Sequence, residues 1–107
     1  MPERDKTCPV ADTAALIGDK WALLILRDLA EGTRRFGELE KSLAISPRTL
    51  SARLSELEQK GVVTRQCYAE VPLRVEYSLT KKGQAIIPIV EAMRAYGKEW
   101  LSSCQGL

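Results

Sequence analysis

Histidine is absent from this sequence of 107 residues. Because imidazole is a common protein ligand of zinc and the usual general base, its absence argues against a zinc site and a histidine-based catalytic triad. No apolar run approaches the roughly 20 residues of a membrane span, and the N-terminus lacks the apolar core of a signal peptide. No pair of nucleophile and base is visible either. We therefore expect a cytoplasmic protein that is not an enzyme and holds no cofactor.

Cysteine is scarce, and the three residues, Cys8, Cys67 and Cys104, include no Cys-x-x-Cys pair. Widely spaced thiols in a reducing compartment are not expected to form a disulfide framework. Cys67 lies in a predicted strand, and we expect it to be packed there without a chemical role. Cys8 allows two interpretations: a small apolar residue beside a helix start, or a thiol whose ionised form the helix N-terminus stabilises.

Charge of one sign is not in excess, since 16 lysines and arginines face 14 aspartates and glutamates for a net charge of +2. The bulk charge therefore does not indicate nucleic acid, and any such interface must come from where the basic residues lie. With 107 residues, of which 45% are hydrophobic, the chain is expected to form a single domain with one core.

A well-bounded helix is predicted over residues 47–60. Ser46 is a preferred N-cap residue, and Pro47 fits the first helical position, where a missing amide hydrogen costs nothing. Gly61 provides a left-handed stop. The inner face of the helix is an apolar stripe formed by Leu50, Leu54 and Leu57.

The opposite face of this helix carries small and hydrogen-bonding side chains, namely Arg48, Ser51, Ala52, Ser55 and Gln59, with Thr49 and Arg53 on its flanks. Such a face can approach a DNA groove without steric obstruction. Taken alone, it is better explained as an ordinary solvated helix surface. The neighbouring elements decide between the two interpretations.

The segments before this helix predict three others. The first covers residues 10–17 and ends at Gly18, and the second, capped by Asp19, is apolar on most faces and must be central to the core. A brief extended link leads to a third helix near residues 37–44. The connection to the helix at 47–60 is so short that the pair is typical of a helix-turn-helix.

Beyond Gly61 the pattern changes from helical to alternating, which predicts strands at 62–68 and 74–79 joined by a loop. A hairpin directly after a helix-turn-helix is a wing, which here covers residues 62–79. Its loop is placed to reach the DNA backbone or the minor groove, and Arg74 is the expected contact.

A long helix is predicted over residues 81–104, with Thr80 as its N-cap. Pro88 should kink or split it, because proline removes one amide and clashes with the preceding turn. The apolar positions recur at helical spacing, at Val90, Met93, Tyr96, Trp100 and Leu101. The core has little surface left for this stripe, so we interpret the segment as a dimerisation helix. The alternative is that it packs back on its own domain.

With these elements in place, the sequence resembles the HxlR family of bacterial winged-helix transcriptional regulators, relatives of the MarR type. The resemblance covers nearly the whole chain and rests on residues 8–10 (CPV), 17–26 (IGDKWALLIL), 35–39 (RFGEL), 50–58 (LSARLSELE) and 70–80 (EVPLRVEYSLT), followed by Gly83. The departures are minor: Leu73 stands where the wing often has a second proline, and Gly18-Asp19 replaces Gly-Gly or Gly-Lys. Neither touches the predicted DNA-reading face.

The resemblance implies a mainly α-helical fold with a small β-hairpin wing, which is a winged helix-turn-helix of the α+β class. It also implies a homodimer, joined by its first and last helices, that presents two recognition helices to successive major grooves of double-stranded DNA. A dimer in turn implies an inverted-repeat operator with half-sites about one helical turn apart. We therefore expect a sequence-specific DNA-binding regulator that acts as a repressor.

On this interpretation the expected base contacts are Arg48, Thr49, Ser51 and Ser55, and the expected phosphate contacts are Ser46, Arg53, Arg74, Arg34 and Lys20. The competing interpretation is a winged helix that binds a protein or a small ligand and does not read an operator. Arg48 and Arg53 argue against it, because such modules usually lack arginine on this face.

Many members of the family that the chain resembles sense oxidants, quinones or aldehydes through a cysteine at the place of Cys8. The resemblance therefore favours a reactive Cys8, with an oxidant or another small molecule as the inducer. Cys104 follows Trp100 by one turn on the expected interface. In a dimer built from first and last helices, Cys8 of one subunit approaches Cys104 of the other, and an intersubunit disulfide between them is a hypothesis to test.

Overall fold

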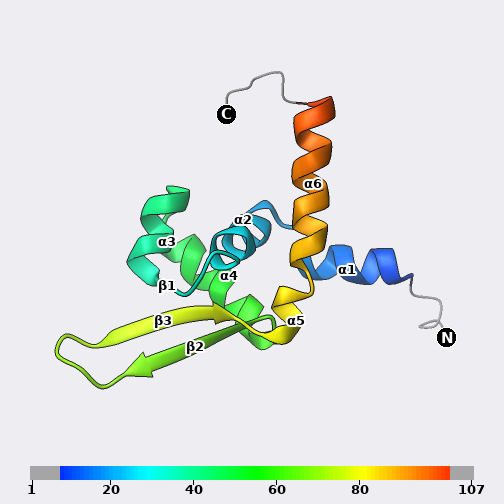
Figure 1. The fold of residues 1–107 in the computed structure, drawn as a ribbon. Helices are drawn as coiled ribbons and strands as arrows, with labels where there is room; N and C mark the ends of the chain where they lie inside the picture. Colours follow the sequence, from blue (N-terminus) through cyan, green and yellow to red (C-terminus); the bar gives the residue numbers. More distant parts are fainter. Residues whose placement is uncertain (1–7, 102–107) are drawn as a thin grey trace.

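The computed structural model describes residues 8–101. Its elements follow in the order α1 (Pro9–Ile17), α2 (Lys20–Leu29), β1 (Arg34–Arg35), α3 (Phe36–Leu43), α4 (Pro47–Gln59), β2 (Val63–Tyr68), β3 (Arg74–Leu79), α5 (Lys81–Gln84) and α6 (Ile87–Trp100) (Figure 1). The strands form one antiparallel sheet in the order β1-β3-β2. This mainly helical chain with a small hairpin confirms the predicted winged-helix fold class. Within residues 8–101, no helix is long and apolar enough to cross a membrane.

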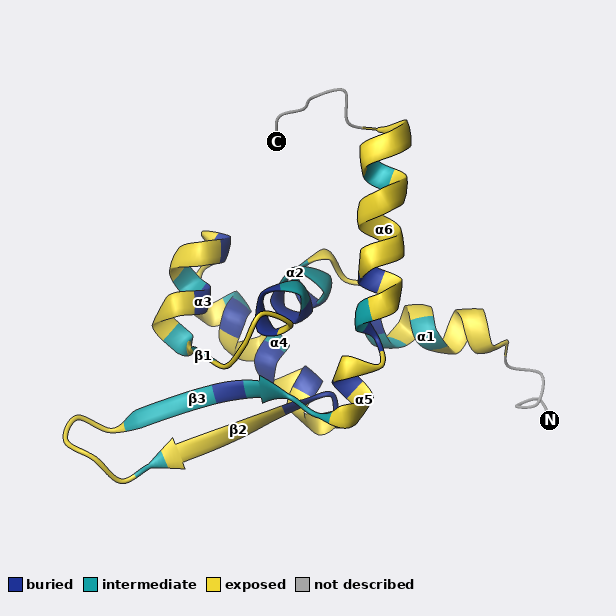
Figure 2. Cartoon of the chain, in the orientation of Figure 1, coloured by how far each residue is buried: buried dark blue, intermediate teal, exposed yellow. Residues whose placement is uncertain are grey.

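The helix α2 lies at the centre of the hydrophobic core and packs against α3, α4 and α6. Its side chains Ile25 and Leu26 are fully buried, and Leu39 of α3 and Leu50 and Leu54 of α4 are buried with them. Figure 2 shows these buried positions grouped where the helices meet the inner end of the hairpin. Each such side chain stabilises the fold by about 1.5–3 kcal/mol on removal from water, so this cluster holds α4 in place.

The local structure of α4 follows from its ends. The Ser46 hydroxyl oxygen accepts a hydrogen bond of 3.2 Å from the backbone amide of Thr49, and Pro47 occupies the first turn. The helix ends at Gln59, one residue earlier than predicted, and Gly61 follows with φ of 79°. The leucine stripe at positions 50, 54 and 57 faces the core, so the remaining face of α4 is turned outward.

The turn between α3 and α4 is made without glycine. Ala44 adopts φ of 52° and ψ of 45°, a left-handed conformation that costs a non-glycine residue about 1–2 kcal/mol. Ile45, directly after it, is buried in the core, and Ser46 then caps α4. The packing of Ile45 and the cap of α4 hold the strained residue in place.

The hairpin of β2 and β3 extends beyond the core (Figure 1). The two strands pair from Val63 opposite Leu79 to Tyr68 opposite Arg74. On β2 only Val63 is buried, and the side chains that follow are exposed on both faces up to the half-buried Tyr68. Cys67 is exposed. The expectation that Cys67 is packed was therefore wrong, because nothing in residues 8–101 covers this part of the hairpin.

The segment predicted as a helix over residues 81–104 is split in two, which corrects its bounds. α5 ends at Gln84, and α6 begins at Ile87 with Pro88 in its first turn. A split is one of the two effects expected of Pro88, which has no amide hydrogen to donate to the preceding turn. Gly83 is required in α5, because a Cβ atom there would collide with the carbonyl oxygen of Val62. Residues 102–104, including Cys104, lie outside the described residues.

The helices α1 and α6 project from the core in different directions, and most of their surface is exposed (Figures 1 and 2). An apolar groove runs between them and is lined by Val10 and Ile17 of α1 and by Ile89 of α6. The exposed large apolar side chains of the two helices and of the residue after α6 are Val10, Ile89, Met93, Tyr96, Trp100 and Leu101. Nothing within residues 8–101 covers this surface.

Candidate DNA interface

The outward face of α4 presents Arg48, Ser51 and Ser55, all of them exposed. They are spaced at i, i+3 and i+7, so they lie on one side of the helix. Ala52 beside them is also exposed and adds little bulk. Within residues 8–101 the Arg48 guanidinium forms neither a hydrogen bond nor an ion pair. No group in this part of the chain therefore competes with DNA for Arg48.

Two further residues predicted to contact DNA, Ser46 and Thr49, form hydrogen bonds with each other at the start of α4. The Ser46 hydroxyl accepts the Thr49 amide and also lies 3.0 Å from the Thr49 hydroxyl. Thr49 is half-buried. Both hydroxyls sit at the helix N-terminus, where backbone amides and the helix dipole favour a negatively charged phosphate.

Arg53 is held by carboxylates of the protein itself. Its guanidinium forms ion pairs with Asp19 at 3.3 Å and with Glu56 at 3.2 Å. The Asp19 carboxylate also caps α2 by accepting the Ala22 amide at 3.0 Å. The structure thus ties the flank of α4 to the start of α2 through Arg53, a role that its helix position alone does not reveal.

Arg74, the expected wing contact, is surrounded at the end of the hairpin. Its guanidinium pairs with Glu70 at 2.7 Å and with Glu76 at 2.9 Å, and it stacks over the Tyr68 ring at 3.9 Å. Partial desolvation would lower the pKa of Arg74, but the hydrogen bond to Glu70 and the two carboxylate charges outweigh it and raise the pKa. Arg74 therefore holds the wing loop against the strands, and a phosphate has to compete with two carboxylates for it.

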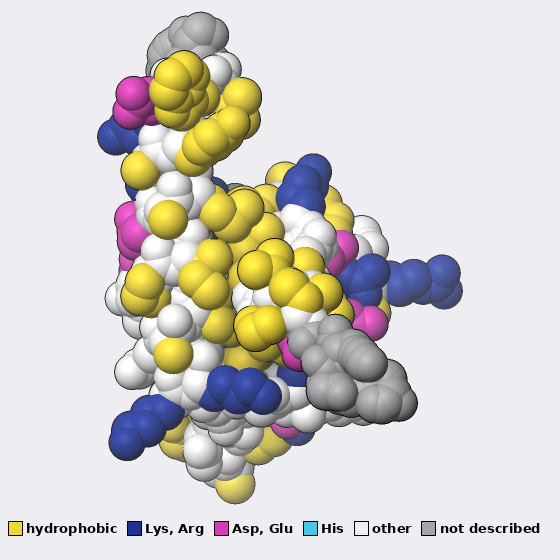
Figure 3. All heavy atoms as spheres, turned by 90° about the vertical axis from the view of Figure 1, so that its right-hand side faces the viewer, with side chains coloured by type: hydrophobic (Ala, Val, Ile, Leu, Met, Phe, Trp, Pro, Cys, Tyr) yellow, Lys and Arg dark blue, Asp and Glu magenta, His cyan; other side chains and the backbone are white. Residues whose placement is uncertain are grey.

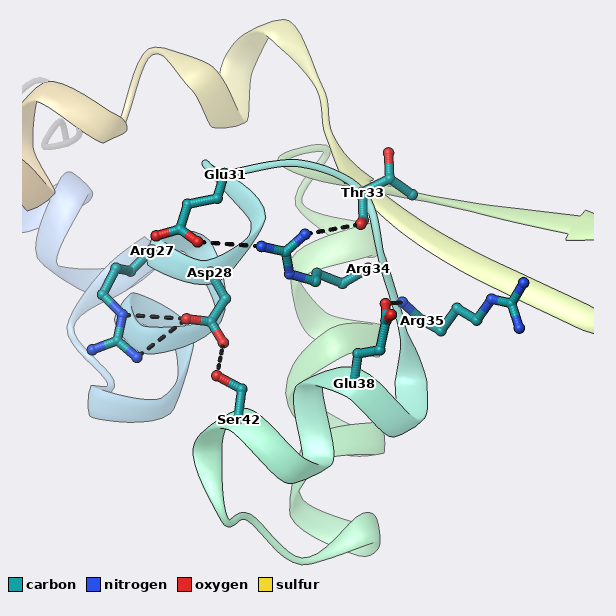
Figure 4. Close-up of polar contacts among 8 residues, drawn as sticks. All are labelled: Arg27, Asp28, Glu31, Thr33, Arg34, Arg35, Glu38 and Ser42. Atoms are coloured by element: carbon teal, nitrogen blue, oxygen red, sulfur yellow. Dashed lines mark hydrogen bonds and ion pairs between the residues drawn. The ribbon is translucent and has the colours of Figure 1, made fainter.

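The structure does not bring Arg34 and Lys20 onto the outward face of α4. Arg34 pairs with Glu31 at 3.2 Å and donates to the Thr33 carbonyl oxygen at 3.2 Å (Figure 4). Lys20 lies 4.7 Å from the Trp21 ring centre and lines a cavity between α2 and α6. Of the arginines predicted to contact DNA, Arg48 alone has no partner within residues 8–101.

Two other exposed arginines, Arg35 and Arg65, were not predicted as DNA contacts. Arg35 directly precedes α3, its backbone amide donates to Glu38 at 2.8 Å, and its side chain points away from the other residues in Figure 4. Arg65 lies on β2, where a hydrogen bond with Tyr77 on the paired strand raises its pKa. Arg35 stands at the N-terminus of α3, where free backbone amides favour a phosphate, so its position before a predicted helix could have indicated a phosphate contact.

Known proteins share both the sequence and the fold. The HxlR-like helix-turn-helix family matches residues 16–105 of the sequence. This chain belongs to that family. An uncharacterised HTH-type transcriptional regulator of Synechocystis is 42% identical over 106 residues, which cover 96% of this chain and 78% of the relative.

Solved structures with the same fold include the redox regulator HypR in its reduced form, with a TM-score of 0.82 and 39% identity over 86% of this chain and 92% of that one. The reduced form of the transcriptional regulator YodB from B. subtilis has a TM-score of 0.77 and 36% identity, covering 92% of this chain and 99% of the other. The HxlR-like chain is therefore a helix-turn-helix transcriptional regulator and not an enzyme.

In this HxlR-like regulator, Cys8 is the N-cap residue of α1 and is exposed. Its carbonyl oxygen accepts the Asp12 amide at 2.9 Å, while its side chain makes no capping hydrogen bond. The thiol is thus accessible at the start of α1. The second predicted redox residue, Cys104, lies outside the described residues.

Proposed function

We propose that two copies of this chain bind an inverted-repeat operator on double-stranded DNA and repress transcription in the cytoplasm, where that DNA lies. The observation that carries the proposal is the outward face of α4. It combines an arginine without a partner in residues 8–101 with small and hydroxyl-bearing side chains at Ser51 and Ser55. Arginine recognises guanine through two hydrogen bonds in the major groove, and small neighbours let the helix approach the base edges.

The dimeric state is proposed from the apolar surface of α1 and α6. Figure 3 shows hydrophobic side chains gathered along α6 and beside it. Exposed apolar patches of this kind mark protein–protein interfaces, and tryptophan and tyrosine dominate the energetics of such contacts. A two-fold dimer of this type presents its two α4 helices to half-sites about one helical turn apart.

Phosphate contacts are proposed for Ser46, Arg53, Arg74, Arg34 and Lys20, and base contacts for Arg48, Thr49, Ser51 and Ser55. These residues differ in how many internal ion pairs each would have to give up in order to contact DNA. Arg48 meets DNA without breaking a contact within residues 8–101, whereas Arg53 and Arg74 have to leave or share the carboxylates of Glu56 and Glu70.

Replacing Arg48 tests the proposal directly. Arg48→Ala is expected to weaken operator binding by about 1–3 kcal/mol, the value of a bidentate contact with guanine, without changing the stability of the fold. The measurement is fluorescence anisotropy on the DNA upstream of the protein's own gene, at several salt concentrations, with random DNA of equal length beside it.

The control is Lys81→Ala, which removes the same charge from α5, and it should leave the preference for the operator intact. An equal loss of affinity on operator and random DNA makes Arg48 a backbone contact. Wild-type protein that shows no salt-dependent binding to any DNA would favour the module that binds a protein or a small ligand instead.

We further propose that oxidants or electrophiles control the repressor through Cys8. The support is its exposed position at the start of α1, together with a structural neighbour described as a redox regulator and one solved after diamide treatment. Because α1 belongs to the proposed dimer surface, a change at Cys8 alters the spacing of the two α4 helices.

Diamide treatment is expected to produce a covalent dimer on a non-reducing gel, since two thiols are oxidised to one disulfide while diamide takes up two electrons and two protons. The band should disappear in Cys8→Ser and in Cys104→Ser, and it should persist in Cys67→Ser. A wild-type protein that shows no covalent dimer after treatment excludes the Cys8–Cys104 disulfide.

A further inference from the structure

The end of the wing is apolar and exposed. The loop between β2 and β3 covers residues 69–73, and every side chain in it is exposed (Figure 2). Val71, Pro72 and Leu73 form a run here that we call the wing tip; Val71 is fully exposed and Leu73 is 65% exposed. Single exposed apolar residues are common on protein surfaces, but a run of three is unfavourable unless it has a function. Nothing within residues 8–101 covers it.

The residues behind the wing tip hold it in place. Arg74 closes the loop, because its guanidinium pairs with Glu70 at 2.7 Å and stacks over the Tyr68 ring at 3.9 Å. The Glu70 amide also donates to the Tyr68 carbonyl oxygen at 2.8 Å. Glu70 is the only charged residue of the loop, and Arg74 balances its charge. A tip that is braced in this way loses little conformational entropy when it binds a partner.

The length of the hairpin suits the distance between two grooves of DNA. The strand β2 begins two residues after Gly61 and packs against α4. Its six residues span about 20 Å, so the wing tip lies roughly that far from the end of α4. The centres of a major groove and the next minor groove are half a helical turn apart, about 17 Å. The hairpin is therefore long enough to reach the minor groove beside the major groove that α4 would occupy.

We propose that the wing tip is an apolar wedge, in which Val71 and Leu73 enter the minor groove, separate two stacked base pairs and bend the operator. The proposal rests on the proposed function of α4. Side chains of this kind unstack base steps in proteins that bend DNA. Unstacking is unfavourable, but removal of two exposed apolar side chains from water offsets it. Because Arg74 is already paired with carboxylates, the wing offers apolar surface more readily than a cation, which suits stacked bases better than phosphates.

A wedge also adds to the choice of sequence. Steps such as TA and CA unstack and kink more easily than a stiff run of adenines. The wing tip therefore favours operators that carry a flexible step in the flanking minor groove, at base pairs that α4 does not contact. Val71 and Leu73 then determine specificity through the deformability of DNA and not through hydrogen bonds.

The test measures bending and affinity on one duplex, taken from the DNA upstream of the protein's own gene. Energy transfer between dyes at its two ends reports the bend, and fluorescence anisotropy reports the affinity. Wild-type protein should bend the duplex by about 20–90°, the range for inserted side chains. Val71→Ser combined with Leu73→Ser should remove most of the bend and weaken binding by about 10–100-fold. Val71→Ile combined with Leu73→Met keeps the tip apolar and should retain both.

The matched control is Gln66→Ser, an exposed change in the middle of β2, which should alter neither the bend nor the affinity. Wild-type protein that binds the duplex and leaves it straight overturns the wedge but not the proposed function, and so does a double serine variant that still bends it. A loss of bending that the isoleucine–methionine variant shares also overturns the wedge. Wild-type protein that binds no DNA overturns both proposals. A double serine variant with a changed mass in sedimentation means that a second copy of the chain covers the wing tip, which overturns the wedge as well.

Discussion

Replacing Tyr96 and Trp100 together with aspartate is expected to make the protein monomeric and to weaken operator binding by about 10²–10⁴-fold, the gain that joining two binding modules provides. Both side chains are more than half exposed in the single chain, at 60% and 68%. In the proposed dimer they become the buried aromatic anchors of the interface. Two carboxylates at these positions would have to lose their water without a partner, which is unfavourable by several kcal/mol.

Sedimentation equilibrium measures the mass, and anisotropy measures affinity for a full operator and for a single half-site. The variant should retain half-site affinity, since α4 is far along the chain from the altered residues and keeps its core contacts. Lys98→Asp is the matched control: it lies about 160° around α6 from Trp100 and should leave the dimer unchanged. A Tyr96→Asp, Trp100→Asp protein that stays dimeric excludes α6 as the interface.

Much of the fold could be predicted because its signals are local in sequence. The cap of α4 depends on Ser46 and Pro47, which are adjacent, and the leucine stripe needs only a helical repeat. The strand β3 begins at Arg74 and ends at Leu79 as predicted, because alternating residues lie between a proline-containing loop and a helix cap. Each of these features can be recognised within about ten residues.

The features that could not be predicted depend on contacts between distant elements. Asp19 and Arg53 are separated in the chain by two helices, a short strand and a turn, yet they form an ion pair. Cys67 lies in a segment whose composition fits a packed strand, but the hairpin has left the core by that point, so the residue is exposed. A sequence pattern predicts that a strand forms, but it does not predict whether another part of the protein packs against that strand.

The same distinction applies to the candidate DNA contacts. Helical spacing placed Arg48, Ser51 and Ser55 on one side, and the structure shows all three exposed. Spacing gave no indication that Glu70 and Glu76 hold Arg74, because that cluster exists only once the hairpin forms. Arginines in similar sequence contexts therefore differ in whether they must break an ion pair with a carboxylate before they can bind a phosphate.

Neighbouring positions on α4 are expected to separate stability from DNA binding. Leu54→Ala should lower the free energy of unfolding by about 2–5 kcal/mol, the range for truncating a buried leucine, because Leu54 is 1% exposed in the hydrophobic core. Ser55→Ala should change the free energy of unfolding by less than about 0.5 kcal/mol, as for most surface substitutions. It should instead weaken operator binding by about 0.5–1.5 kcal/mol, the net value of one hydrogen bond.

Urea unfolding at one fixed protein concentration measures the first effect, since the stability of a dimer depends on concentration. Anisotropy below the unfolding transition measures the second. Loss of stability in Ser55→Ala comparable to that in Leu54→Ala would mean that the face carrying Arg48 is packed and not free. The two side chains are adjacent in sequence and about 100° apart around the helix, so a clear separation of their effects would show that α4 uses one face to remain folded and the other to read DNA.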